Sequence, residues 1–259
     1  MNALPDSLKV RMEGAVAILT IDRVAKRNAI DDATIQGIGA FFASPPEGAR
    51  AAVIHGAGED FCAGLDLASL KETSAAEGIH HSRLWHRALD ALELGAVPVV
   101  AALHGAVVGG GLEIASACHI RVAEPSTFYA LPEGSRGIFV GGGGSVRIPR
   151  LMGVARMADM MLTGRTLSAE EGLAAGLSQY LVGTGEALAK ATALAKTIAA
   201  NAPMTNFAVI QALPRIAEAG RDAGLLAESL VSAIAQDAPE AKQRMADFIA
   251  KRGPKVERK

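Results

Sequence analysis

The chain has little of what several protein classes depend on. It contains only two cysteines, Cys62 and Cys118, in 259 residues, which argues against a disulfide framework and favours a reducing compartment. Aromatic residues make up only 4% of the sequence, so the core must be built from aliphatic side chains. No unbroken apolar run reaches the ~20 residues of a membrane helix, and the N-terminus lacks a signal-peptide pattern. We therefore expect a cytoplasmic protein with no membrane partner.

A strong net charge is also absent. The 26 basic residues nearly balance the 27 acidic ones, for a formal net charge of −1, which argues against a nucleic-acid partner. Only the last residues, 251–259, are locally basic. The simpler interpretation is a solvated tail, and the alternative is a contact with an anionic group.

Two patterns divide the chain. Predicted strands at 16–21, 51–55, 98–103, 119–123 and 127–130 alternate with predicted helices at 31–42, 80–94 and 110–118, which is typical of an α/β fold. Only helices are predicted after that, at 169–175, 185–201, 205–219, 225–235 and 239–251. We expect an α/β core in residues 1–202 and a helical region in 203–259. The apolar stripe Leu226, Leu230 and Ile234 would need the core or another subunit to cover it.

The glycines at 109–111 lie between an apolar strand and a short predicted helix. The first turn of a helix has unpaired N–H groups and a partial positive charge, so an oxyanion can be stabilised there by backbone alone. Glycine permits the close approach that a Cβ would block. Tight packing of strand against helix is the alternative. The spacing is not that of a dinucleotide loop, and the run Gly141–Gly144 is interpreted as a packed or flexible turn.

Two carboxylates follow these glycines. Glu113 falls in the first turn of the short helix among apolar neighbours, so we expect a raised pKa that suits acid–base chemistry near neutrality. Glu133 follows the rigid Pro132 and precedes a glycine. In isolation each could instead be an ordinary surface carboxylate, and Asp66 is interpreted as a helix cap. The histidines at 80, 81 and 86 lack zinc-site spacing, so no metal site is predicted, and Trp85 is assigned to the core.

In combination these segments closely resemble the crotonase superfamily of enoyl-CoA hydratases and isomerases. The resemblance rests on Phe61-Cys62-Ala63-Gly64-Leu65-Asp66, on the run from His104 to Glu113, on Lys26-Arg27-Asn28-Ala29, and on later landmarks at 161–165 and 174–177. It covers nearly the whole chain. It implies an α/β spiral of β-β-α turns with a helical C-terminal trimerisation region, assembled as a homotrimer or as a homohexamer of two trimers.

The resemblance also implies an acyl-CoA ligand and assigns residues to it. The N–H groups of Ala63 and Gly110 would form an oxyanion hole for the thioester oxygen, with Glu113 and Glu133 as the acid–base pair. Coenzyme A, as part of the substrate, would be held in the same subunit by the backbone around Lys26 and Ala29 and around Ala63, Gly64, Leu65, Asp66 and Leu67. Phe248 and Lys251 of a neighbouring subunit would contact the adenine and phosphates. No separate cofactor is implied.

Within the superfamily, the presence of both glutamates favours addition of water across a 2-enoyl-CoA double bond. The alternatives are a CoA-thioester hydrolase or a double-bond isomerase on the same scaffold, and a catalytically silent acyl-CoA binder. Gly134-Ser135-Arg136 and Val140 depart from the common hydratase pattern, which argues against a simple straight-chain substrate. The stretch 129–147 is more similar to a subgroup that includes methylthioacryloyl-CoA hydratase.

Overall fold

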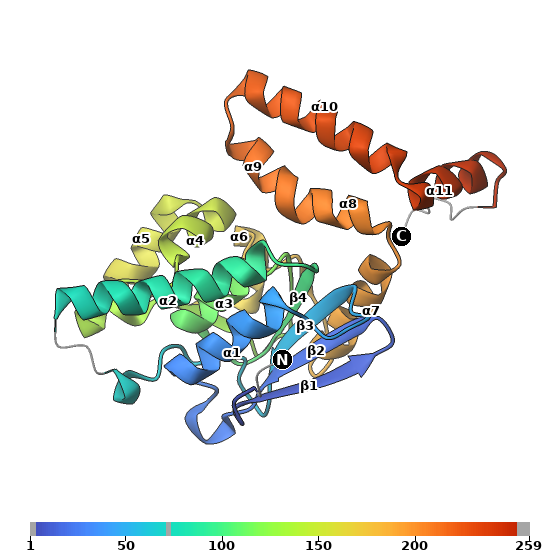
Figure 1. Cartoon of the computed structure of the whole chain (residues 1–259). Helices are drawn as coiled ribbons and strands as arrows, with labels where there is room; N and C mark the ends of the chain where they lie inside the picture. Colours follow the sequence, from blue (N-terminus) through green and yellow to red (C-terminus); the bar gives the residue numbers. More distant parts are fainter. Residues whose placement is uncertain (1–3, 71–73, 253–259) are drawn as a thin grey trace. The chain divides into compact units, whose positions relative to one another are not determined.

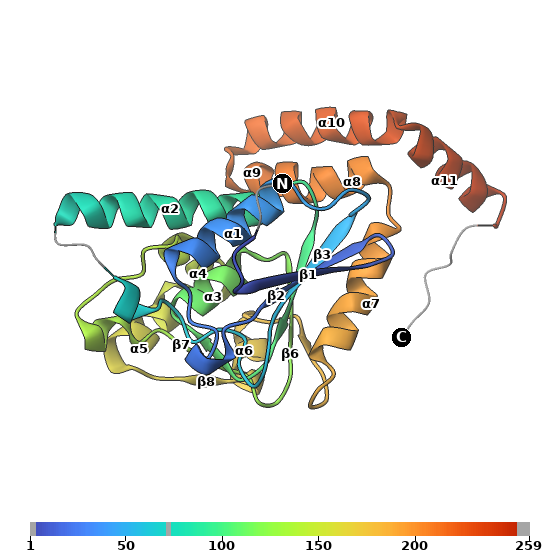
Figure 2. The ribbon, with the colours of Figure 1, turned by 60° about the horizontal axis from the view of Figure 1, so that its bottom comes forward.

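Parallel strands buried on both faces form the centre of the fold. The computed structural model describes residues 4–70 and 74–252, and these fall in two compact units, residues 1–199 and 200–259. In the first unit a six-stranded sheet has the order β1-β2-β3-β4-β6-β9, and Figures 1 and 2 show β1, β2 and β3 side by side. β1 is antiparallel to β2 and the remaining pairs are parallel. The strands are β1 (Leu8–Glu13), β2 (Val16–Ile21), β3 (Ala51–Gly56), β4 (Val99–Leu103), β6 (Ile120–Ala123) and β9 (Tyr180–Leu181).

A second, three-stranded sheet has the order β5-β7-β8. Its strands are β5 (Ala106–Val108), β7 (Phe128–Ala130) and β8 (Leu167–Ser168). The helices of the first unit are α1 (Asp32–Ala43), α2 (Ala75–Glu93), α3 (Gly110–Ala117), α4 (Gly144–Met152), α5 (Val154–Thr163), α6 (Ala169–Ala175) and α7 (Ala187–Ala199), with short 3-10 turns at Val24–Lys26, Leu67–Ser69 and Pro132–Arg136. The predicted α/β architecture is therefore confirmed.

Alternate residues of the large sheet serve two hydrophobic cores, as the two-residue period of a strand requires. On one face, β2, β3 and β4 pack against the alanine stripe of α7, which is made of Ala187, Ala191, Ala195 and Ala199. On the other face, Leu19 and Ile54 join the larger core with side chains of α1, α2 and α3. Small alanines let α7 lie close to the strands, which explains how an alanine-rich sequence with few aromatic residues still fills its interior.

The first helix, α1, begins at the position predicted from the sequence. The carboxylate of Asp31 accepts the Thr34 amide and caps α1, because an N-cap oxygen satisfies one of the unpaired donors of the first turn. The predicted cap at Asp66 is wrong. Asp66 precedes the turn Leu67–Ser69 but makes no side-chain capping bond, since its carboxylate is bound instead to Arg23 and Lys26.

The described part of the second unit, residues 200–252, contains helices and no strand. These are α8 (Pro203–Phe207), α9 (Leu213–Glu218), α10 (Arg221–Asp237) and α11 (Pro239–Ile249), and a π-helical turn at Ala208–Ala212 joins α8 to α9. The helix expected at 205–219 is thus interrupted by this turn. Leu226, Leu230 and Ile234 lie along α10 and are each more than half exposed, so the apolar stripe read from the sequence is present on a helix surface.

Candidate active site

A cavity of about 340 Å³ lies in the first unit, bounded by α2, the start of α3, the Pro132–Arg136 turn and the segment 138–142. Its wall includes both glutamates predicted from the sequence, Glu113 and Glu133, together with Gly110 and Leu65. Segments that lie far apart in the chain therefore meet around one space.

Glu113 is buried at the start of α3, with 4% of its surface exposed. One carboxylate oxygen, Oε1, accepts the backbone N–H groups of Gly142 and Gly144, both at 2.8 Å. Burial raises the pKa of Glu113 to about 7, the two N–H donors act in the opposite direction, and the charge of Glu133 adds to the rise. The pKa of Glu113 is therefore near neutrality, as its apolar neighbours in the sequence predict.

Glu133 lies in the 3-10 turn and is 6% exposed. Its Oε1 reaches the β5–α3 junction, because a Cβ placed on Gly109 would lie 2.7 Å from that oxygen. Its Oε2 is buried and has no hydrogen-bond partner among residues 4–70 and 74–252. Burial raises the pKa of Glu133, while its own backbone N–H and the charge of Arg136 oppose the shift. Both carboxyl groups therefore favour the protonated form more than an exposed glutamate does.

Two backbone amides lie near each other in the cavity wall, those of Leu65 and Gly110. A Cβ on Gly110 would lie 3.3 Å from the Leu65 nitrogen, and a Cβ on Gly64 would lie 3.6 Å from the Gly110 nitrogen. Gly110 opens α3, so its N–H has no intrahelical partner. In the part of the chain that the structure describes, no hydrogen bond is recorded for the Leu65 N–H. This arrangement provides two donors for one ligand oxygen.

The predicted oxyanion donor at Ala63 is wrong. The Ala63 N–H donates to the Arg27 carbonyl at 3.0 Å, and Ala63 is not among the residues that line the cavity. The preceding amide, that of Cys62, is also used internally, by the Ala106 carbonyl. Gly64 then takes a φ of +102°, a conformation that glycine adopts readily. The chain direction changes there, and the next amide, Leu65, lies at the cavity.

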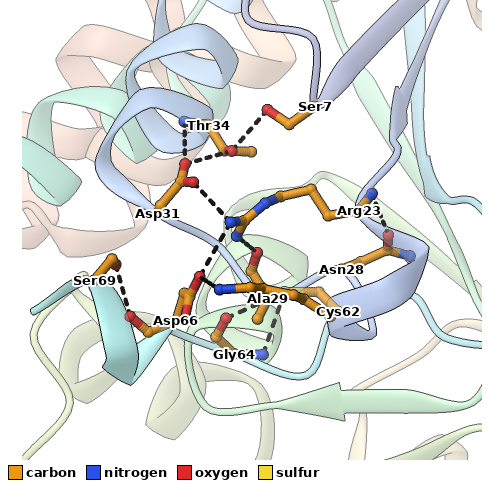
Figure 3. A network of polar contacts seen from close by, with 11 residues as sticks. Ser7, Arg23, Asn28, Ala29, Asp31, Thr34, Cys62, Gly64, Asp66 and Ser69 are labelled. Carbon is orange, nitrogen blue, oxygen red and sulfur yellow. Dashed lines mark hydrogen bonds and ion pairs between the residues drawn. The ribbon is translucent and has the colours of Figure 1, made fainter.

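The residues predicted to hold coenzyme A in the same subunit lie along two segments joined by hydrogen bonds, and Figure 3 shows three of them, Ala29, Gly64 and Asp66, close together. The Ile30 amide donates to the Gly64 carbonyl and the Asp66 amide to the Ile30 carbonyl, each at 2.8 Å. Asp66 binds Lys26 at 2.8 Å and Arg23 at 3.1 Å, and Arg23 also donates to the Ala29 carbonyl. Lys26, Ala29 and residues 63–67 are thus brought together, although the Lys26 ammonium already has a carboxylate partner.

The other two predicted contacts, Phe248 and Lys251, belong to the second unit. Phe248 lies on α11 and is 66% exposed, and Lys251 follows the helix end with a φ of +58°. Both side chains are available at the surface of their unit. Their contact with a ligand of another subunit remains a prediction.

Trp85 of α2 belongs both to the core and to the cavity wall, whereas the sequence favoured the core alone. It is 3% exposed, and a Cβ on Gly110 would lie 2.8 Å from its Cη2 atom. Its indole N–H donates to His81 at 3.2 Å, and His81 also lines the cavity. Among the described residues no group of three or more His, Cys, Asp or Glu side chains is arranged to hold a metal.

The glycine run Gly141–Gly144 has a more specific place than the turn expected from the sequence. Two of its amides hold Glu113, as described above, and a Cβ on Gly144 would lie 2.8 Å from the Glu113 Cγ atom. The signal was present as four consecutive glycines, but their partner lies about thirty residues earlier in the chain. Arg136 and Val140 line the cavity, whereas the Ser135 hydroxyl donates to the Pro132 carbonyl at 2.7 Å.

Within the described ranges, no helix has the combination of length and apolar character that crossing a membrane requires. The sequence model of the family described as enoyl-CoA hydratase/isomerase matches residues 11–259. A short-chain-enoyl-CoA hydratase from Clostridium acetobutylicum is 33% identical over 243 residues, covering 93% of each chain. A carnitinyl-CoA dehydratase from Salmonella arizonae is 34% identical over 222 residues, covering 85% of this chain and 83% of the other.

Solved structures agree with the sequence comparisons. A crystal structure from Rhodopseudomonas palustris has a TM-score of 0.92 and 56% sequence identity, with 95% of each chain covered. An enoyl-CoA hydratase from Bacillus anthracis has a TM-score of 0.89 at 27% identity, covering 97% of this chain and 99% of the other. With a family match over nearly the whole sequence and a crotonase-type fold, this chain belongs to the enoyl-CoA hydratase/isomerase family of the crotonase superfamily.

Proposed function

We propose that this chain is an enoyl-CoA hydratase, which adds water syn across the 2,3-double bond of a 2-enoyl-CoA thioester. One observation carries the proposal: two buried carboxyl groups, Glu113 and Glu133, share a cavity whose wall presents the adjacent amides of Leu65 and Gly110. Conjugate addition of water needs a base, an acid and a place for negative charge on a carbonyl oxygen. The cavity offers each of them.

The amides act on the thioester. Its carbonyl oxygen accepts hydrogen bonds from Leu65 and Gly110, and negative charge grows on that oxygen as water attacks C3. Donors fixed in advance at such a position stabilise the transition state, and the loss of one typically costs about 3 kcal/mol of barrier. The proposed oxyanion hole therefore keeps the predicted Gly110 N–H, and the Leu65 N–H takes the place of the predicted Ala63 N–H.

The glutamates divide the proton transfers. Glu113 removes a proton from water while the water oxygen bonds to C3, and the π electrons of the double bond move onto the thioester oxygen. The enolate then re-forms the carbonyl as C2 takes a proton from Glu133. One water is consumed, and a proton passes from Glu113 back to Glu133 through exchange with solvent to restore the starting state.

The hydrogen bonds around each carboxyl group support this division. The Gly142 and Gly144 amides both donate to Glu113, and such donors favour the ionised form. The Oε2 of Glu133 is buried without a donor in the described part of the chain, which suits a protonated oxygen ready to give its hydrogen. A base whose pKa is about 7 is strong enough to activate water and is still partly ionised at neutral pH.

The remaining expectations for the substrate extend this proposal. Coenzyme A enters as part of the substrate and is held by Lys26, Ala29 and residues 63–67, with Phe248 and Lys251 supplied by a neighbouring subunit of a homotrimer or homohexamer. The reaction uses the two carboxyl groups and needs no separate cofactor. The cationic Arg136 at the cavity supports a short or heteroatom-substituted acyl group, such as methylthioacryloyl, over a long hydrocarbon chain.

A panel of 2-enoyl-CoA thioesters of varied length and β-substituent tests the proposal. Hydration removes the enoyl-thioester absorbance without releasing a free thiol, hydrolysis releases the thiol, and double-bond isomerisation moves the alkene without adding water. We expect the first pattern for the wild type, and E113Q and E133Q should each bind a saturated acyl-CoA but lose turnover. Thiol release as the main reaction, or full turnover by either variant, would contradict the assignment.

A further inference from the structure

Arg147 of α4 is a buried cation beside the active site that the reaction scheme above leaves unused. Its side chain is 8% exposed. Its Nε donates to Glu93 at 2.6 Å and its Nη2 to Asp90 at 2.8 Å, and both carboxylates belong to α2. Its third contact is with backbone, where Nη1 donates to the Gly142 carbonyl at 3.0 Å. The guanidinium therefore ties one long helix to the glycine segment.

The Gly142 contact leads directly to Glu113. The carbonyl of Gly142 is held by Arg147, and the N–H of the same residue donates to Glu113 at 2.8 Å. The Gly142 N–H belongs to the preceding peptide, whose Gly141 carbonyl accepts the Ser82 hydroxyl, and Arg147 holds the following peptide. The two bonds together restrain the backbone angles of Gly142, which glycine itself leaves free. Space around the guanidinium is tight as well, because a Cβ on Gly143 would overlap Arg147 Nη1.

Arginine suits this task because its planar fork presents several donors in a fixed geometry. Here Nε and Nη2 bind the two carboxylates of α2, and Nη1 donates to the Gly142 carbonyl. α2 also carries Trp85, which forms the cavity wall beside Gly110. Arg147 thus links the glycine segment to the helix that forms part of the cavity wall.

From these contacts we infer that Arg147 is a positioning residue for Glu113: it fixes the peptide between Gly142 and Gly143, which joins the two amides, those of Gly142 and Gly144, that meet one oxygen of the proposed base. The inference rests on the proposed function for its catalytic consequence, but the geometric claim stands apart from it. The charged groups that act on Glu113 are Glu133 and Arg147 itself, so loss of the Arg147 charge also removes an influence that lowers the pKa of Glu113.

The test compares R147Q and R147K with R150Q, an exposed arginine on the same helix. In R147Q we expect kcat to fall about 100-fold with KM within about twofold of the wild type, since the base is misplaced while the acyl-CoA site is kept. The acid limb of the pH profile should move to higher pH. R147K keeps the charge but lacks the fork, so it should recover the pH profile but not kcat. R150Q should match the wild type in all three measurements.

Backbone hydrogen exchange provides a readout that does not depend on activity. The amides of segment 141–144 should exchange about tenfold faster in R147Q than in the wild type or R150Q. Where R147Q fails to fold, E93Q takes its place, because it weakens one anchor and leaves Arg147 present. We expect a several-fold drop in kcat and faster exchange in the same segment.

Unchanged exchange at 141–144 in the folded variants would overturn the inference. Normal kcat and pH profile in R147Q with only a lower melting temperature would overturn it too, because the arginine would then serve stability alone. Full activity of R147K would show that charge, and not the fork, is what matters, which also overturns it. If the wild type hydrates no enoyl-CoA, the proposed function fails, and the exchange comparison still decides the role of Arg147.

Discussion

Replacement of Glu113 by glutamine should make the protein increasingly more stable than the wild type as pH rises. In the folded state burial raises the pKa of Glu113 from 4.5 to about 7. Between these two values the folded protein holds a proton that the unfolded chain has released, so wild-type stability falls as pH increases through this window. Glutamine can still accept the Gly142 and Gly144 amides through its oxygen, and it has no ionised form to bury.

The size of the effect follows from the two pKa values. Each pKa unit corresponds to about 1.4 kcal/mol, so the interval from 4.5 to about 7 amounts to roughly 3 kcal/mol. The advantage of E113Q over the wild type should therefore grow by roughly 3 kcal/mol between about pH 4.5 and about pH 8, and it should level off above that. Removal of the carboxylate abolishes the proposed base, so the stabilised variant should also be inactive.

The assay is urea-induced unfolding at a series of pH values, with ionic strength and protomer concentration held constant. E47Q provides the control, because Glu47 is exposed in a loop and its removal reports the effect of losing one surface charge. A stability difference between E113Q and the wild type that stays constant across the range, after this correction, would refute the reasoning. Glu113 would then have an ordinary pKa in the folded protein.

Three further predictions concern the site and its scaffold. E133Q should lower kcat by about 100-fold or more, because the acid is lost, with saturated acyl-CoA binding kept in a calorimetric titration; an unchanged kcat would remove Glu133 from the mechanism. G110A should lower kcat/KM by about 100-fold, since the new Cβ would lie 2.8 Å from Trp85 Cη2 and push the oxyanion donor away; wild-type kinetics would argue against this hole. D60N should cost about 2 kcal/mol of unfolding free energy at neutral pH, because the carboxylate accepts Arg27 at 2.8 Å. Arg27 lowers the pKa of Asp60, so this stabilisation should fade in acid unfolding curves below about pH 3.8, and a constant deficit would contradict it.

Local pattern was sufficient to predict much of the scaffold. Short runs such as 16–21 and 51–55 are apolar at all positions but one, Thr20 and His55 respectively, which is typical of parallel strands with both faces buried, and the structure has strands there. The segment 144–163 carried no comparable pattern. Its helices α4 and α5 are short and glycine-bounded, and Pro149 lies inside α4, so local propensity argued against a helix.

The assignment of Ala63 as an oxyanion donor came from the family resemblance, and the structure shows why matching the motif did not identify the right amide. Ala63 and Leu65 lie on either side of Gly64 in the segment 61–66, and both have nonpolar side chains. Which amide is free depends on the Arg27 carbonyl, which takes the Ala63 N–H, and on the positive φ of Gly64. The first is a contact across 36 residues, and no propensity scale contains it.

Hydrogen bonds from the surrounding backbone determine how the two glutamates differ in protonation, because their carboxyl groups are chemically identical. Two ionised glutamates in one cavity repel each other, and if their surroundings were alike, neither would be set apart as the base. They are not alike, because the Gly142 and Gly144 amides converge on Glu113 while Oε2 of Glu133 is buried with no partner among the described residues. Glycine is what allows those amides to approach, since a Cβ at Gly142 or Gly144 would lie about 3 Å from Glu113. A substitution in this segment, G142A for example, should therefore alter the pH dependence of the reaction without replacing any ionisable residue, and kinetics from about pH 5 to about pH 9 would reveal a displaced acid limb. An unchanged profile would mean that the amides do not set the charge of the base.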